Sequence, residues 1–140
     1  MPVLVDTSAW IEFYHPKGDP VVKRRVTEAI AEDEVATVAP IVAELLVGAR
    51  KASERQAIEH DLRILRLLPL GWDEAAAAAG VGQALDRAGR RAPMVDLLIA
   101  AAAHRYGCAL WHLGDEHYDA IADVSGWRVT NLRPSRSPRP

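Results

Sequence analysis

In V-L-V-D-T-S, residues 3–8, an acid and two hydroxyls directly follow a short apolar run. The run predicts a buried strand over residues 2–5, because proline is tolerated at the first position of a strand. Asp6 then has two readings. It could cap a helical turn over residues 8–13, since aspartate is a preferred N-cap residue, or it could bind a metal ion. The rest of the chain has to decide between them.

Short apolar runs and helical patterns alternate along the rest of the chain. Further strands are expected over 35–38, 67–70, 109–112 and 127–130, and helices over 20–31, 40–50, 53–67, 73–88 and 94–106. The residue types favour Asp19, Ser53 and Asp73 as N-caps, and a turn at 114–115. This alternation indicates βαβ units, and therefore an α/β fold with a mainly parallel sheet.

The composition fits one globular domain in a reducing compartment. The chain has 140 residues, of which 49% are hydrophobic, so it can bury a core. The single cysteine, Cys108, excludes an intramolecular disulfide and a cysteine-based zinc site, and a cytoplasmic location is expected. The sequence shows no signal peptide and no membrane-spanning stretch. We expect residues 1–132 to form the domain, and 133–140, rich in Arg, Pro and Ser, to form a disordered basic tail.

Four acids border apolar runs: Asp6, Glu44, Asp96 and Asp115. Three of them could simply cap a helix or begin a turn, and Glu44 could face solvent, although its helix is apolar enough to be buried on most faces. Together they fall after expected strands or near helix starts, and open α/β sheets bind ligands outside the carboxyl ends of the strands. Because clustered carboxylates repel one another unless a cation lies among them, the set predicts a metal site.

The chemistry of this acidic set points to phosphate substrates. Oxygen ligands, without cysteine or histidine at ligand spacing, favour Mg²⁺ or Mn²⁺, and such ions typically act on phosphates. The net charge of −2 alone argues weakly against nucleic acid. However, setting four of the 19 acids aside leaves 15 against 17 basic residues, which is a mildly basic remainder.

The residues around the four acids resemble the PIN domain, and within it the VapC-type toxins of bacterial and archaeal toxin–antitoxin pairs. The resemblance rests on D-T-S-A-W-I at 6–11, the apolar helix with Glu44, V-D-L-L-I-A-A-A-A at 95–103 and L-G-D-E-H-Y at 113–118. It implies a three-layer α/β/α sandwich, homodimers, a VapB-type antitoxin and metal-dependent endoribonuclease activity. It also implies that the four acids are the catalytic and metal-binding residues, and that the metal activates a water for in-line attack on an RNA phosphate.

The chain departs from this family around the fourth acid. Many relatives carry Thr or Ser where this chain has Leu113, and a second Asp followed by Phe where it has His117 and Tyr118. Because histidine binds a hard cation less readily than a carboxylate does, the departure disfavours a permanently occupied second metal site. The candidates for contacting the substrate or supporting the acids are Thr7, Ser8, His117 and Arg91.

Other interpretations stay open at this point. A non-catalytic RNA- or protein-binding α/β module, whose acids only cap helices, would fit the same pattern, and titration with Mn²⁺ would separate it from an enzyme. A haloacid-dehalogenase-type enzyme usually continues D-x-D, whereas this chain has D-T-S, and a receiver-type domain needs a late lysine that the chain lacks. A DNA flap nuclease would usually need a longer chain to grip a duplex.

Overall fold

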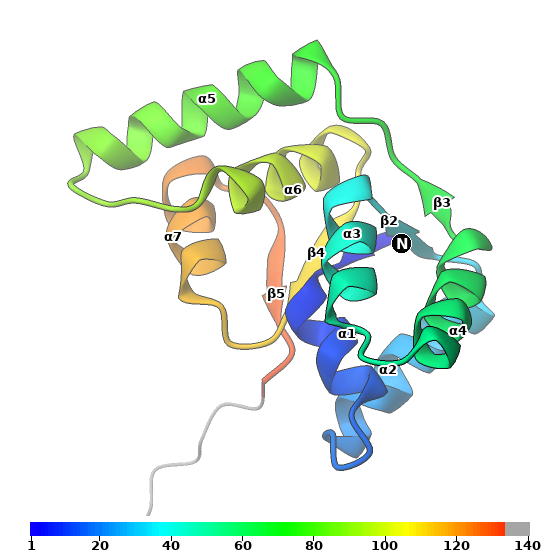
Figure 1. Cartoon of the computed structure of the whole chain (residues 1–140). Coiled ribbons are helices and arrows are strands. Elements are labelled where there is room, and N and C mark those ends of the chain that lie inside the picture. The colour runs from blue at the N-terminus through cyan, green and yellow to red at the C-terminus, as the bar shows by residue number, and fades with distance from the viewer. Residues whose placement is uncertain (134–140) are drawn as a thin grey trace, which may run out of the picture.

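The computed structural model describes residues 1–133, and its centre is a five-stranded sheet (Figure 1). The strands are β1 Val3–Val5, β2 Val35–Thr37, β3 Arg66–Leu67, β4 Ala109–His112 and β5 Val129–Asn131. They lie in the order β3-β2-β1-β4-β5, and every neighbouring pair is parallel. The expected α/β fold with a parallel sheet is therefore confirmed.

Seven helices connect these strands within the described residues. They are α1 Thr7–Tyr14, α2 Pro20–Ala31, α3 Ala39–Gly48, α4 Ala52–Arg63, α5 Trp72–Arg87, α6 Met94–Arg105 and α7 Glu116–Ser125. In Figure 1, α5, α6 and α7 gather on one side of the strands, and α1, α2 and α4 lie on the other. The chain winds outward from β1 to β3 and then crosses back to β4, and right-handed crossovers in opposite directions place helices on opposite faces. The result is the expected three-layer sandwich.

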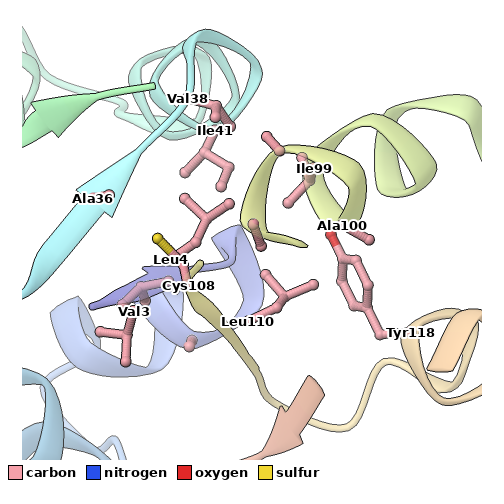
Figure 2. Close-up of a cluster of buried hydrophobic side chains, with 14 of the residues drawn as sticks. Val3, Leu4, Ala36, Val38, Ile41, Ile99, Ala100, Cys108, Leu110 and Tyr118 are labelled. Atoms are coloured by element: carbon pink, nitrogen blue, oxygen red, sulfur yellow. The ribbon is translucent and has the colours of Figure 1, made fainter. Parts of the chain in front are cut away.

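The central strands are buried on both faces, as is typical of parallel sheets. Leu4 of β1 and Leu110 of β4 are fully buried and lie opposite each other in the register. Figure 2 shows Ile41 of α3 and Ile99 of α6 in the same apolar cluster. Because this packing fixes the register, β1 and β4 end side by side, and the acids that follow them start from one edge of the sheet.

Among the elements of residues 1–133, helix α7 is the one that the sequence does not predict. Only a turn is expected at residues 114–115, whereas the chain continues into a helix of 10 residues. The helix buries Tyr118 and Ile121, which are three residues apart and so lie on one face. Because many residues of this helix are polar, its short apolar face is not apparent in the sequence, and only the turn before the helix is predicted.

Two expected helix caps are wrong. Helix α4 begins one residue before Ser53, with Lys51 at the N-cap and no side-chain cap, and it ends at Arg63. It cannot extend to 67, because the chain has to straighten into β3, which also lies slightly earlier than the expected strand over 67–70.

Asp73 is the second such case, since it lies inside the first turn of α5 rather than at its cap. The side chain of Glu74 accepts the hydrogen bond from the backbone N–H of Gly71 instead. Asp19 does cap α2 as expected, by accepting a hydrogen bond from the N–H of Val21. Most of the basic tail expected over 133–140 lies outside the described residues. None of the helices in residues 1–133 is long and apolar enough to cross a membrane.

Candidate active site

Asp6 lies directly after β1 and is almost fully buried, with 5% of its surface exposed. Its Oδ2 accepts hydrogen bonds from the backbone N–H of Ser8 at 3.0 Å and from the Ser8 hydroxyl at 2.6 Å, which caps α1. Its Oδ1 accepts a hydrogen bond from the hydroxyl of Tyr118 at 2.7 Å. The capping interpretation of Asp6 is therefore confirmed, and three donors hold the carboxylate in one orientation.

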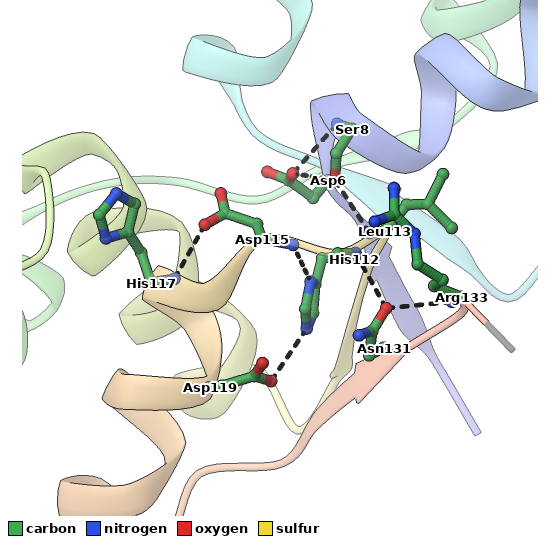
Figure 3. A network of polar contacts seen from close by, with 10 residues as sticks. Asp6, Ser8, His112, Leu113, Asp115, His117, Asp119, Asn131 and Arg133 are labelled. Carbon is green, nitrogen blue, oxygen red and sulfur yellow. Dashed lines mark hydrogen bonds and ion pairs between the residues drawn. The ribbon is translucent and has the colours of Figure 1, made fainter. Parts of the chain in front are cut away.

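The loop after β4 is held by side chains from three different elements (Figure 3). The successive N–H groups of residues 113–115 donate to Ser8 Oγ at 3.0 Å, Asn131 Oδ1 at 2.9 Å and His112 Nδ1 at 3.1 Å, in that order. Backbone groups that are bound in this way cannot hold a phosphate. The loop is therefore a support for the residue that it carries, Asp115.

Asp115 also caps a helix, but its carboxylate accepts one hydrogen bond where that of Asp6 accepts three. It is the N-cap of α7, and its Oδ1 accepts a hydrogen bond from the N–H of His117 at 2.9 Å. In Figure 3 its carboxylate is directed to the same region as that of Asp6. The two acids that follow strands thus lie at one edge of the sheet, each tied to the start of a helix.

Asp96 and Glu44 come from helices and are held differently. Asp96 lies in the first turn of α6, whose N-cap is Pro93, and it makes no capping hydrogen bond. Glu44 lies in the middle of α3 and is exposed. The expectation that α3 is buried on most faces is wrong: only Ile41 and Leu45 of this helix are buried, because it packs on α1 and α4 and leaves its other side to solvent.

The four acids nevertheless interact electrostatically, as the pKa of Asp96 shows. The pKa of Asp96 is raised from 3.8 to about 7, first by burial and then by the negative charges of Asp115, Asp6 and Glu44. His117, which lies in the first turn of α7, opposes this effect. The charges of the other three acids therefore act on Asp96, in addition to the larger effect of its burial.

A hard divalent cation fits this acidic set by its chemistry. Carboxylate oxygens are the preferred ligands of Mg²⁺ and Mn²⁺, and a cation would remove the repulsion that raises the pKa of Asp96. Within residues 1–133, however, no three His, Cys, Asp or Glu side chains are grouped closely enough to hold an ion as they stand. Because Asp6 and Asp115 are fixed, the side chains of Asp96 and Glu44 are the ones that would have to move toward a bound ion.

His112 and Tyr118 support the two fixed acids from the core. His112 is completely buried, and its Nδ1 accepts the hydrogen bond from Asp115, so the proton of the neutral ring is on Nε2. That nitrogen lies 3.5 Å from Oδ1 of Asp119, and burial lowers the pKa of His112, which keeps the ring neutral. Burial and the charge of Asp6 raise the pKa of Tyr118, which therefore stays a hydrogen-bond donor.

The other candidate residues occupy distinct positions around the acids. Ser8 uses both its hydroxyl proton and a lone pair within the protein, so it supports the site rather than contacts substrate. Thr7 has a buried hydroxyl without a partner in the described part of the chain. His117 is half-buried beside Asp115, and its charge acts on Asp96.

Arg91 lies apart from this cluster, in the exposed loop between α5 and α6. It lines a cavity of about 440 Å³ together with Gln83, Asp86 and Leu97. Its neighbour Arg90 is already paired with Asp123 at 3.0 Å. Arg91 is thus an exposed cation five residues before Asp96 in the sequence, without a direct contact to the acids.

Among the supporting residues, Tyr118 and Asn131 are not candidates in the sequence. Tyr118 is separated from Asp6 by 112 positions, so only the folded chain shows that they meet. A tyrosine at a buried helix position is nevertheless a usable signal, because its hydroxyl needs a hydrogen-bond partner there. Asn131 lies in the last strand and has no such signal.

Comparison with known proteins gives the same fold and one family. Residues 3–124 match the model of the PIN domain family. The chain is 33% identical over 130 residues to Ribonuclease VapC18 of Mycobacterium tuberculosis, covering 90% of this chain and 91% of that protein. It is 37% identical over 139 residues to Ribonuclease VapC11 of the same species, covering 94% of this chain and 96% of that protein.

Solved structures agree along nearly the whole chain. FitAcB from Neisseria gonorrhoeae has a TM-score of 0.75 at 25% identity, covering 92% of this chain and 96% of that one. VapBC-5 from Mycobacterium tuberculosis, described as a member of a family of toxin–antitoxin systems, has a TM-score of 0.61 at 26% identity, covering 95% of this chain and 98% of that one. These similarities extend over every element that carries one of the four acids.

Proposed function

The chain belongs to the PIN domain family, and on this premise we propose that it is a divalent-metal-dependent endoribonuclease, the toxin of a VapBC-type pair. The observation that carries the proposal is that Asp6 and Asp115 follow neighbouring parallel strands and direct their carboxylates to one region. The negative charges of Asp115, Asp6 and Glu44 also act on Asp96, whose pKa is raised first by burial and then by these charges. Acids that served only as caps would have no reason to converge. Two curated relatives that match at least nine-tenths of this chain are named as ribonucleases, which supports the same activity.

In this proposal Asp6, Glu44, Asp96 and Asp115 hold Mg²⁺ or Mn²⁺, which when bound supplies a contact for the scissile phosphate and lowers the pKa of an attacking water. The chain's own contribution is positioning. Ser8 and Tyr118 orient Asp6, and the hydrogen bonds of the 113–115 loop orient Asp115. Asp96 has to lose its proton before it can act as a ligand, since its pKa is raised to about 7.

The RNA contacts that we propose surround this acidic set. His117 lies beside Asp115 and is the nearest candidate, whereas the hydroxyl of Thr7 is buried, which suits a supporting role better than contact with RNA. Arg91 is an exposed cation at the α5–α6 turn, where it can pair with a phosphate outside the cleaved bond. Since the net charge is −2, these few groups rather than an overall basic surface have to attract the RNA.

A VapB-type antitoxin is the partner that we propose for an apolar groove beside Glu44. The groove has a volume of about 580 Å³ and is lined by Ile11, Leu45 and Ile58, with Glu44 and Glu54 at its sides. An amphipathic segment with basic residues fits this combination of apolar surface and negative charge. We further propose that the toxin is a cytoplasmic homodimer, as the family resemblance implies.

Cleavage of RNA by the purified full-length chain tests the proposal. RNA should be cut in the presence of Mn²⁺ or Mg²⁺ and left intact with EDTA, and mapping the new ends would identify the cleaved sequence. Asp96→Asn should lower the rate by about a thousandfold or more, because the cluster loses a charged ligand. Glu28→Gln, at an exposed acid of α2, is the matched control and should cleave like the wild type.

One observation favours the alternative of a non-catalytic binding module: Asp6 and Asp115 do cap helices. Asp96 and Glu44 make no caps, however, and a set of caps predicts no gain of stability with metal. RNA binding without cleavage, together with an unfolding temperature that Mn²⁺ leaves unchanged, would favour the binding module. Undiminished cleavage by Asp96→Asn in the presence of metal would rule out the catalytic role of the cluster.

A further inference from the structure

Tyr118 makes the longest-range side-chain contact to the acidic cluster. It lies in the first turn of α7 and is completely buried, with its ring against that of His112 at a centroid distance of 5.3 Å. Its hydroxyl donates to Oδ1 of Asp6 at 2.7 Å, across a sequence separation of 112 residues. The helix that begins at Asp115 is thereby tied directly to the acid at the end of β1.

The hydrogen bonds of Asp6 leave it little freedom as a ligand. An ionised carboxylate has about two acceptor positions on each oxygen. Both positions on Oδ2 are occupied, by the N–H and the hydroxyl of Ser8. One position on Oδ1 is occupied by the hydroxyl of Tyr118. Only the second position on Oδ1 remains, and its direction is set by where Tyr118 holds the oxygen.

We propose that Tyr118 is a positioning residue that restricts Asp6 to binding a divalent cation through one oxygen, Oδ1. The inference rests on the proposed function, because it assumes that Asp6 is a metal ligand. It concerns a feature of this chain in particular: the hydroxyl exists because a tyrosine occupies position 118. Groups that hydrogen-bond to metal ligands orient them, and losing one typically weakens metal binding by about 10- to 100-fold.

The competing explanation is that the hydroxyl only satisfies a buried polar atom in the core. Both explanations predict some loss of stability when the hydroxyl is removed, so stability does not separate them. They differ in metal affinity and in which oxygen of Asp6 binds the cation. Those two quantities are therefore the ones to measure.

Calorimetric titration of the full chain with Mn²⁺ gives the first measurement. Tyr118→Phe removes the hydroxyl and keeps the ring, and it should weaken Mn²⁺ binding by about tenfold or more. Tyr14→Phe is the matched control, since the hydroxyl of Tyr14 donates to Oδ2 of Asp61 at 2.9 Å on a different carboxylate. This control should bind Mn²⁺ like the wild type. Circular dichroism would show that both variants are folded.

A crystal structure of the wild type with Mn²⁺ keeps the inference testable even if Tyr118→Phe fails to fold. In that structure Mn²⁺ should be bound to Oδ1 of Asp6, and the hydrogen bond from Tyr118 to the same oxygen should be retained. A Mn²⁺ bound through Oδ2, or equal affinities of the wild type and Tyr118→Phe, would overturn the role of Tyr118 and leave the proposed function standing. A wild type that binds neither Mn²⁺ nor Mg²⁺ would overturn the proposed function and the inference together.

Discussion

The acidic cluster has two halves that are built in opposite ways. The strand-end pair, Asp6 and Asp115, caps α1 and α7 and is fixed by hydrogen bonds from both backbone and side chains. The helix-borne pair, Glu44 and Asp96, makes no cap and projects from α3 and α6. Four carboxylates with one proposed task therefore have very different surroundings.

The difference indicates a division of roles within the site. The hydrogen bonds of the strand-end pair hold its carboxylates in place before any ion arrives. Asp96 is partly buried against that charge, and its pKa rises to about 7. On the proposed function, the strand-end pair defines where a cation binds, Asp96 responds by losing its proton, and the exposed side chain of Glu44 closes on the ion.

The largest expected effect is stabilisation by Mn²⁺. At a free concentration of about 100 times Kd, an ion that binds only the native state stabilises it by about 2.7 kcal/mol. Thermal unfolding with and without Mn²⁺ would measure this gain. It should nearly disappear in Asp96→Asn, because the site loses one of its four proposed carboxylates and keeps only Asp6, Asp115 and the exposed Glu44, and it should persist in Glu28→Gln. A full gain in Asp96→Asn would mean that the helix-borne pair has no part in binding.

Asp6→Asn should have the next largest effect, a loss of about 2 kcal/mol in the metal-free protein. The amide would place an NH₂ group where Asp6 now accepts hydrogen bonds on both oxygens, so one donor would face another. Asp96→Asn should instead stabilise the metal-free protein at pH 8, because it removes a repelled charge. Chemical denaturation in EDTA would show these opposite signs, and equal losses in both variants would contradict the division of roles.

The sequence alone predicts the central strands well and the edge strands less well, for a physical reason. Strand β4 is found over the expected residues, Ala109–His112, because a strand buried on both faces is a continuous apolar run. The edge strands β3 and β5 are shifted from their expected positions to Arg66–Leu67 and Val129–Asn131. Edge strands are packed on fewer sides, so their composition specifies their ends less closely.

The site divides in the same way. The four acids are recognisable in the sequence because each interrupts or borders an apolar run, as Asp96 does in V-D-L-L-I. The residues that support them are not recognisable in the sequence, because their roles depend on contacts between distant segments. Tyr118 contacts Asp6, and Asn131 holds the loop at Gly114. Sequence patterns report burial and local geometry, whereas hydrogen bonds across the fold appear only once the register of the sheet is known.

The pH dependence of stability should show the response of Asp96 in the metal-free protein. Its pKa is 3.8 in the unfolded chain and about 7 in the native state, so between these values the native protein holds a proton that the unfolded chain has lost. Stability therefore falls as the pH rises through this window and levels off above it. Because other groups titrate as well, the measurement is the difference between the wild type and Asp96→Asn in EDTA, from pH 4 to pH 8. A difference that does not change with pH would mean that neither burial nor the neighbouring charges raise the pKa of Asp96.

The smallest expected effect tests whether the loop of residues 113–115, which carries Asp115, has to be rigid. Gly114 has a positive φ of 69°, and a Cβ there would lie 2.7 Å from Cζ of Arg133. Gly107 has the same φ of 69° with no atom within 4 Å of its Cβ position, so it is a matched control. Both alanine variants should lose about 1 kcal/mol from backbone strain, since the flexible end of Arg133 can move away.

Only Gly114→Ala should also weaken Mn²⁺ binding, because the N–H of Gly114 is one of the three that hold the loop carrying Asp115. Unfolding and Mn²⁺ titration of the two variants would separate the backbone strain, which they share, from the displacement of the loop, which they do not. An equal Mn²⁺ affinity in both would show that Asp115 tolerates movement of its loop. Within the strand-end pair, only Asp6, held by its three donors, would then need a fixed position.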